Sequence, residues 1–308
     1  MMQDRDAFFI GNEWLKPASS KTFQLVGAST GEVVATVPEA VETDVDRAVA
    51  AAREAFDHSG WATMAPAERA IVMRRFMAAL ATRGPDLAQA VSMQNGMPIA
   101  LSEMLEGQFP VGILDYYAGL ADTMGSDDIR PSQMGKQTIV ERPAIGVVAA
   151  IVPWNFPVTL ALSKIAPAMA AGCTLVIKPS PGTILDSYIV AEAALEAGVP
   201  AGVLNWVAAD RAVGAYLVSH PGVDKVAFTG STAAGRKVAA VCGDLLRPVT
   251  LGLAESRPRS YSKMPTSTAS CRACRWRRCS TTARPATMAR ACSPPPVVMP
   301  RWSMGWPR

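Results

Sequence analysis

Residues 145–157 read IGVVAAIVPWNFP, a run of small apolar residues that ends directly in a loop with two prolines. The run 146–152 predicts a buried strand, because it is built from Val, Ala and Ile and carries no charge. Pro153 and Pro157 would fix the backbone on either side of Asn155. The stretch is typical either of a rigid turn that packs two aromatic side chains or of a loop that presents one amide to a developing oxyanion.

Downstream of this stretch, predicted helices alternate with short apolar strands. Such an order predicts an α/β fold in which a doubly wound, Rossmann-like parallel sheet carries helices on both faces. Ligands of such sheets bind at the carboxyl ends of the strands. The predicted helices cover 160–171, 185–197, 212–219 and 233–242, and the predicted strands cover 174–177, 203–207, 225–228 and 248–253.

Upstream of the same stretch, the sequence favours helices framed by two extended pieces. Residues 8–14, FFIGNEW, predict a strand and a turn, and residues 137–142 predict a further strand. Thr43 is predicted to cap the first helix. Further helices are predicted at 66–83, ended by Gly84-Pro85, at 86–94, and within 99–124, where Pro110 bends the chain.

The composition of the 308 residues is that of a folded protein, since 49% are hydrophobic and 18% are charged. These values exclude a disordered chain, a collagen-like repeat and a small disulfide scaffold. The formal net charge of +4 conceals a division, because residues 254–308 contain eleven Lys and Arg, one acidic residue, and neither Leu nor Ile. We therefore expect a folded region over 1–253 and a basic, disordered tail over 254–308.

The sequence favours a cytoplasmic location. Residues 4–6, DRD, interrupt the region in which a signal peptide would need an apolar run. The longest apolar stretches, 145–152 and 165–177, are too short to cross a bilayer. Cys173 and Cys242 are isolated from each other, which is typical of buried thiols in a reducing compartment.

Two more predicted strands end in residues suited to a nucleotide. Lys178-Pro179-Ser180 follows one strand, although a lysine at a strand end is usually a solvated charge. Residues 228–235, FTGSTAAG, take another strand through a Gly-Ser-Thr turn into a helix. Free N–H groups at such a helix start suit a phosphate, but a simple helix cap needs the same residues.

These three strand ends, in this order, resemble the aldehyde dehydrogenase superfamily of NAD(P)-dependent enzymes. The likeness runs from FFIGNEW to about Leu253, through VERPAIGVVAAIVPWNFP, LVIKPS, GVPAGVLN and HPGVDKVAFTGST. It implies a Rossmann-type cofactor domain, an oligomerisation hairpin of which about 137–145 is a part, and a separate catalytic domain. The family oxidises aldehydes to carboxylic acids through a Cys thiolate, with hydride passing to NAD(P) and a Glu-activated water releasing the acid.

The resemblance also implies roles for individual residues. Asn155 would donate to the oxyanion. Trp154, Lys178 and Ser180 would line the adenosine ribose, whereas Gly230 and Ser231 would lie beneath the pyrophosphate. The whole expected cofactor site is Val152, Pro153, Trp154, Lys178, Ser180, Phe228, Thr229, Gly230 and Ser231, and no metal site is expected.

Four residues depart from the family pattern. Pro181 stands where members that prefer NAD often carry a Glu for the ribose hydroxyls. Ala209 and Arg211 replace two glycines at which the backbone should approach the adenosine. Gly252 occupies the position of the catalytic Glu and cannot move a proton. We therefore expect weak binding of NAD or NADP at best, with both cofactors left open.

The tail lacks the family's nucleophilic Cys motif as written, but another reading frame permits it. When the third base of each codon joins the first two bases of the next, residues 256–268 can spell SAAIVLEDADLD and residues 280–289 can spell NNGQACYNG. Loss of one base after the Leu253 codon accounts for both matches and for the Arg-rich composition. We therefore expect the catalytic domain to be missing, through a frameshift or a sequencing error, and the chain to be inactive.

Two other classes of function remain open. A non-catalytic fragment would use residues 1–253 to bind a nucleotide or another subunit, without turnover. The homo-oligomer that the family resemblance implies is not expected directly of such a fragment. In the tail, Cys271 and Cys274 form a CxxC, and residues 272–278 form a basic and aromatic run, so zinc or nucleic-acid binding is an alternative. We favour accidental codons for both, because the tail has no His and no second CxxC. We therefore expect an aldehyde as the partner, and we expect binding to neither nucleic acid nor a membrane.

Overall fold

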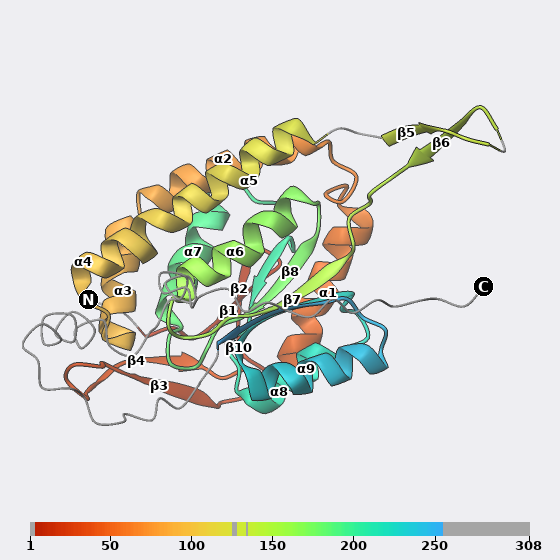
Figure 1. Cartoon of the computed structure of the whole chain (residues 1–308). Coiled ribbons are helices and arrows are strands. Elements are labelled where there is room, and N and C mark those ends of the chain that lie inside the picture. The colour runs from red at the N-terminus through yellow and green to blue at the C-terminus, as the bar shows by residue number, and fades with distance from the viewer. Residues whose placement is uncertain (1–3, 125–127, 134, 255–308) are drawn as a thin grey trace, which may run out of the picture. The chain divides into compact units, whose positions relative to one another are not determined.

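The central sheet of the computed structural model is built mainly from the strands that the sequence predicts (Figure 1). The structure describes residues 4–124, 128–133 and 135–254, and these belong to one compact unit. The seven strands lie in the order β11-β10-β7-β8-β9-β1-β2, parallel from β11 to β9, with β1 antiparallel to both β9 and β2. The strands are β1 (Phe8–Ile10), β2 (Glu13–Leu15), β7 (Val147–Ile151), β8 (Thr174–Lys178), β9 (Leu204–Trp206), β10 (Lys225–Ser231) and β11 (Val249–Ala254).

The order of the strands reverses between β7 and β10. The chain first adds β8 and β9 on one side of β7, and then returns to add β10 and β11 on the other side. Ligands of doubly wound sheets bind at the carboxyl ends of the strands beside such a reversal. The predicted α/β, Rossmann-like parallel sheet is therefore confirmed, and its topology makes the ends of β7 and β10 the candidate site.

Helices cover both faces of the sheet (Figure 1). Helices α6 and α7 pack on one face, with α2 and α5 in a further layer outside them, and α1, α8 and α9 pack on the other face. The helices are α1 (Glu42–His58), α2 (Pro66–Ala81), α3 (Gly84–Asn95), α4 (Ile99–Ser102), the π-helix η1 (Glu103–Gln108), α5 (Phe109–Thr123), α6 (Pro157–Ala170), α7 (Leu185–Glu196), α8 (Arg211–Ser219) and α9 (Thr232–Asp244).

Two predicted helix boundaries are wrong. Thr43 lies inside the first turn of α1, and the N-cap is Val41, whose N–H donates to Asp44 Oδ2 at 3.1 Å. The carboxylate of Asp44 thus satisfies the backbone amide of the N-cap residue, and the Thr43 side chain does not cap the helix. Gly84-Pro85 opens α3 and does not merely end α2, because a proline without an N–H fits the first turn of a helix.

The predicted helix over 99–124 is divided into α4, η1 and α5. Pro110 cannot donate the next helical hydrogen bond, and the wide π-turn directly precedes it. Gly107 in this turn lies against α3, where an added Cβ would come within 2.8 Å of the Gly84 carbonyl oxygen. The sequence therefore predicts the bend but not the π-helical turn.

Two hairpins accompany the sheet. Strand β5 (Asp128–Pro131) pairs with β6 (Gln137–Val140), which confirms the strand predicted near 137–142. Strand β3 (Thr22–Val26) pairs with β4 (Val33–Pro38), which the sequence analysis does not predict.

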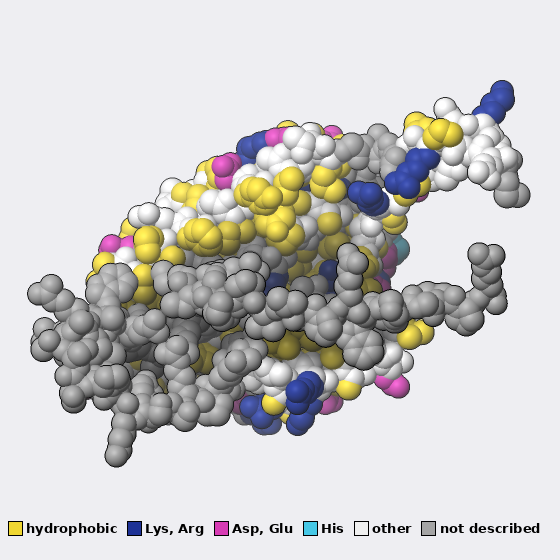
Figure 2. All heavy atoms as spheres, in the orientation of Figure 1, with side chains coloured by type: hydrophobic (Ala, Val, Ile, Leu, Met, Phe, Trp, Pro, Cys, Tyr) yellow, Lys and Arg dark blue, Asp and Glu magenta, His cyan; other side chains and the backbone are white. Residues whose placement is uncertain are grey.

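The two isolated thiols are buried as predicted, whereas several apolar side chains are exposed. Cys173 and Cys242 are buried and free. Exposed apolar side chains gather over α5, where Phe109, Tyr116 and Leu120 are at least 39% exposed (Figure 2). In the part of the chain that the structure describes, no helix is both long and apolar enough to cross a membrane.

Candidate functional site

The loop after β7 is held at the carboxyl edge of the sheet by its neighbours. Val152 N donates to the Lys178 carbonyl oxygen at 3.0 Å. Asn95 Nδ2 donates to the carbonyl oxygens of Trp154 and Asn155, each at 3.2 Å. The Asn155 side chain is half-buried and has no hydrogen-bond partner among the described residues, so its amide is free to donate to a ligand.

The predicted site residues of β8 and β10 lie on either side of this loop. In the sheet, Ile151 at the end of β7 pairs with Lys178 of β8 on one side and with Phe228 of β10 on the other. The structure therefore brings the three predicted strand ends to one edge. Pro153 and Ser180 are half-buried there, Val152 is buried, and Trp154 is 43% exposed.

Lys178 is buried, contrary to the usual fate of a lysine at a strand end. Its Nζ donates to the Pro179 carbonyl oxygen at 3.0 Å. Burial lowers the pKa of Lys178 to about 8, although the Asp210 carboxylate opposes that shift. An added Cβ at Gly214 of α8 would lie 2.9 Å from Lys178 Cε, so this glycine makes room for the lysine stem.

The turn between β10 and α9 forms the other wall of the site. Ser231 Oγ accepts a hydrogen bond from Ala234 N at 3.3 Å and so caps α9, as the simpler reading of this motif predicts. The start of a helix carries a partial positive charge, which favours an anion. Gly230 is required here, because a Cβ would approach the Phe228 ring to 2.6 Å.

The sequence analysis misses Lys164, a residue of α6 that reaches this edge. Lys164 Nζ donates to Thr229 Oγ1 at 2.6 Å. Thr229 lies opposite Gly252 in the register of β10 and β11, and a Cβ on Gly252 would lie 2.9 Å from the same oxygen. Lys164 is revealed only by its hydrogen bond from α6 to β10, because its sequence neighbours on α6 are otherwise typical of a packed helix.

The sequence analysis also misses Glu106, which lies below the loop at the start of α6. Its Oε2 accepts hydrogen bonds from Val158 N at 2.8 Å and Thr159 N at 3.3 Å. Burial raises the pKa of Glu106 to about 8, despite these two amides, and its Oε1 has no partner among the described residues. Glu106 therefore caps the helix that begins at the Asn155 loop.

The three residues expected to weaken cofactor binding differ in burial. Arg211 is exposed at the first position of α8. Asp210 caps α8 by accepting from Val213 N at 2.8 Å. Ala209 is buried in the core, and Pro181 is half-buried.

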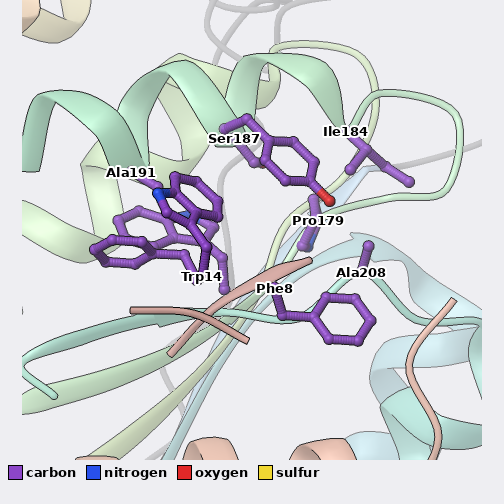
Figure 3. Close-up of a pocket in the computed structure, with 10 residues that line it drawn as sticks. Phe8, Trp14, Pro179, Ile184, Ser187, Ala191 and Ala208 are labelled. Atoms are coloured by element: carbon purple, nitrogen blue, oxygen red, sulfur yellow. The ribbon is translucent and has the colours of Figure 1, made fainter. Parts of the chain in front are cut away.

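A small cavity beside this region does not qualify as a ligand site. It lies between β1, β2 and α7, it is lined by Phe8, Trp14 and Tyr188 among others, and its volume is about 10 Å³ (Figure 3). Such a volume holds at most one water molecule. The described residues contain no group of three or more His, Cys, Asp or Glu that could hold a metal ion.

Comparisons with known proteins agree with the fold and the motifs. Residues 14–257 match the aldehyde dehydrogenase family. The chain is 54% identical over 253 residues to geranial dehydrogenase of Castellaniella defragrans, an alignment that covers 82% of this chain and 53% of that protein. It is 38% identical over 255 residues to phenylacetaldehyde dehydrogenase of Pseudomonas fluorescens, covering 81% of this chain and 51% of that protein.

Solved structures of the same kind superpose on most of the chain. The aldehyde dehydrogenase of Mycobacterium tuberculosis, complexed with NAD+, is 40% identical with a TM-score of 0.80, over 82% of this chain and 52% of that one. Aldehyde dehydrogenase C of Pseudomonas syringae, complexed with NAD+ and octanal, is 36% identical with a TM-score of 0.78, over 82% and 51%. The chain thus spans about half the length of the relatives that it matches. It belongs to the aldehyde dehydrogenase family.

Proposed function

We propose that residues 1–253 form a binding unit for NAD or NADP, with the dinucleotide at the carboxyl ends of β7, β8 and β10. The observation that carries this proposal is the meeting of three predicted motifs at the reversal of the strand order. The capped start of α9 would hold the pyrophosphate beside Gly230 and Ser231. Lys178 and Ser180, with Trp154, would hold the adenosine ribose.

The reaction to which this unit belongs is the oxidation of an aldehyde to a carboxylic acid. The bound dinucleotide supplies a hydride acceptor in such a reaction. Asn155 would donate its free amide to the oxygen of the aldehyde as negative charge develops there.

We also propose that the chain with this sequence does not turn over aldehydes. Gly252 lies at the position of the general base and has no side chain, and the nucleophilic Cys motif is not found in residues 1–308 as written. The frame in which residues 280–289 spell NNGQACYNG supports loss of one base after the Leu253 codon. The tail residues that carry this reading, 255–308, lie outside the described residues.

Calorimetric titration of the purified chain with NAD and with NADP tests the binding proposal. We expect a Kd weaker than about 100 μM, because one family carboxylate is replaced by Pro181. Lys178→Met, which keeps the stem beside Gly214, should weaken binding at least about tenfold, or about 1.4 kcal/mol. Lys237→Met, an exposed control on α9, should change the Kd less than about twofold. Equal effects of the two variants would argue against this site.

A panel of aldehydes, assayed for NADH and NADPH with a heat-inactivated control, tests the second proposal. We expect no production of NADH or NADPH above the control, and steady turnover would contradict the proposal that the chain is inactive.

A non-catalytic subunit-interaction module is the second candidate. It is supported by the exposed apolar side chains of α5 and by Ile129 and Ile139, each 57% exposed on the β5–β6 hairpin. Light scattering on Tyr116→Glu and on the Ile139→Glu variant should then show loss of a dimer or larger species.

A further inference from the structure

The amino group of Lys164 lies at the same strand ends but has a different environment from that of Lys178. Its side chain is half-buried, so part of it remains accessible, whereas Lys178 is only 6% exposed. Lys164 Nζ donates to Thr229 Oγ1 at 2.6 Å and lies 3.4 Å from the Leu160 carbonyl oxygen. Both partners are neutral, so neither of them compensates a positive charge on the amine.

No carboxylate among the described residues forms an ion pair with Lys164. The strand position facing Thr229 is Gly252, which offers only backbone. Glu106 and Asp186 are on elements packed against α6. One oxygen of each accepts a hydrogen bond, from amides at the start of α6 and from the Gln94 side chain respectively, and Glu106 Oε1 has no partner among the described residues. Among the described residues, this edge therefore presents an amine without a carboxylate partner, close to the position at which the family resemblance implies a general base.

An uncompensated, desolvated amine loses its proton more easily than an exposed one. Burial lowers the pKa of Lys164 to about 8. About half of its amino groups are then neutral at pH 8, compared with on the order of 1% for an exposed lysine. Only the neutral amine has a lone pair that can attack a carbonyl carbon.

We propose that Lys164 is a carbonyl-capture site whose Nζ condenses reversibly with an aldehyde to form an imine. The aldehyde as ligand class rests on the proposed function. The nitrogen adds to the carbonyl carbon, and a proton moves from nitrogen to oxygen to give a carbinolamine. A second proton transfer releases the oxygen as water and leaves a C=N bond. No electron is gained or lost in the sequence, and hydrolysis reverses it.

Thr229 is the positioning residue for this chemistry. Its hydroxyl accepts from Lys164 Nζ and holds the amine near the end of β10, opposite Gly252. A Cβ at position 252 would lie 2.9 Å from Thr229 Oγ1, so a residue without a side chain leaves the contact between Thr229 and Lys164 undisturbed. The Asn155 side chain, after the neighbouring strand β7, has no hydrogen-bond partner among the described residues.

Reductive trapping on the full chain tests the proposal. The protein is incubated at pH 8 with octanal and sodium cyanoborohydride, which reduces an imine to a stable secondary amine, and is then digested for peptide mass spectrometry. We expect the octyl adduct on Lys164 at least about tenfold above that on Lys237, which is exposed, and above that on Lys178, which shares the lowered pKa but is less accessible. Adducts on Lys164 at or below the level of Lys237 would overturn the proposal.

The Lys164→Arg variant keeps the charge and a donor to Thr229 but cannot form an imine, so its total adduct should fall by the share assigned to Lys164. Because trapping is read from the unchanged protein, the result does not depend on the folding of this variant. Trapping also needs no dinucleotide. Capture without NAD or NADP binding would therefore contradict only the proposed cofactor function, and binding without capture would contradict only the role of Lys164.

Discussion

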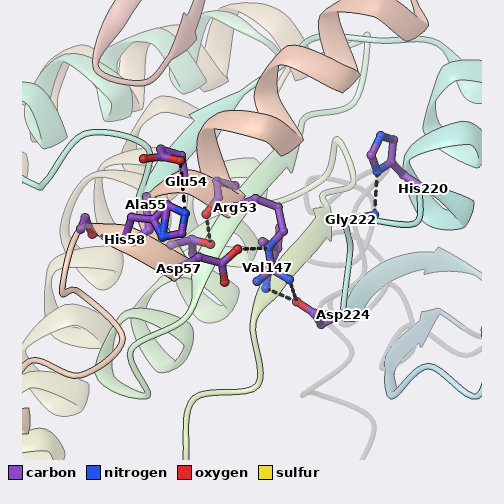
Figure 4. Close-up of polar contacts among 12 residues, drawn as sticks. Arg53, Glu54, Ala55, Asp57, His58, Val147, His220, Gly222 and Asp224 are labelled. Carbon is purple, nitrogen blue, oxygen red and sulfur yellow. Dashed lines mark hydrogen bonds and ion pairs between the residues drawn. The ribbon is translucent and has the colours of Figure 1, made fainter.

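Gly146, immediately before β7, shows how one residue fixes the strand that carries the site. Its φ of +125° is one that residues with a side chain rarely adopt, and an added Cβ would collide with the Asp224 carboxylate. Asp224 Oδ2 accepts from Val147 N at 2.7 Å and pairs with Arg53 Nη1 at 3.0 Å (Figure 4). This cluster ties α1, β7 and the start of β10 together.

Gly146→Ala should therefore destabilise the protein by about 3 kcal/mol, because it combines backbone strain with the loss of the Asp224 contacts. Gly31→Ala is the matched control, since Gly31 has a φ of +73° but no atom within 4 Å of an added Cβ. It should cost only the strain, about 1 kcal/mol. Urea unfolding midpoints measure both, and equal losses would contradict a role for Asp224.

Glu106 should make the protein less stable as the pH rises. Its pKa is raised from an ordinary 4.5 to about 8 in the folded chain, so its favourable contribution is complete below about pH 4.5 and is lost progressively towards pH 8. Glu106→Gln keeps an acceptor for Val158 N but cannot titrate. The difference in urea midpoint between pH 5 and pH 8 should shrink in this variant. Glu103→Gln, exposed on the same π-turn, should leave that difference as in the unchanged protein.

At the scale of residues, the sequence predicts groups that stand at strand ends and misses groups that act across the fold. Ser231 could be placed because its motif lies within the eight residues 228–235. Lys164 and Glu106 could not, because their partners are 65 and 52 residues away. Their pKa values also depend on burial, which a motif does not report.

At the scale of elements, the register of β10 with β11 controls the charge at the site. Gly252→Glu would bring a carboxylate next to the Thr229–Lys164 pair, so it should raise the pKa of Lys164 and reduce octanal trapping there several-fold. Gly252→Gln is the matched control, because it fills the same space without a charge. If both variants reduce trapping equally, crowding of Thr229 by the new Cβ is the cause and the electrostatic argument is wrong.

The helices and strands themselves were largely predictable, because local patterns specify them. The alternation after residue 157 gives the right elements in the right order, with boundaries displaced by a few residues. The exceptions depend on contacts between elements. Asp44 replaces Thr43 as the group that serves the cap of α1, and η1 forms where Gly107 packs against Gly84. The sequence analysis misses the β3–β4 hairpin because six residues separate its strands, and a connection of that length lacks the two-residue turn motif typical of hairpins.

At the scale of the whole molecule, the sequence and the structure account for different halves of the family reaction. The described residues contain the strand ends expected to hold the dinucleotide, together with Asn155. The nucleophile is permitted only by a second reading frame of residues 280–289, which lie outside the described residues. Cofactor binding and covalent chemistry are therefore expected to be separable in this chain.

Restoring one base after codon 253 provides the test of that separation. The tail should then read SAAIVLEDADLD followed by NNGQAC, and the frame should stay open well beyond codon 308, because the relatives are about twice as long as the matched region. With the frame alone restored, thiolate attack and hydride transfer should give a burst of NADH or NADPH, and hydrolysis should be slow because Gly252 supplies no base.

Adding Gly252→Glu to the restored frame should convert the burst into steady turnover. The new carboxylate must displace the Thr229 hydroxyl, since a Cβ at 252 lies 2.9 Å from Oγ1, and Lys164 is close enough to pair with it. Glu should therefore restore deacylation where Gln, of equal size, does not.

Genomic DNA that fails to spell these motifs, or that meets a stop shortly after codon 308 in the restored frame, would show that the tail is not a displaced catalytic domain. The basic and Cys-containing segment 271–278 would then become the part of the chain to test for zinc and nucleic-acid binding.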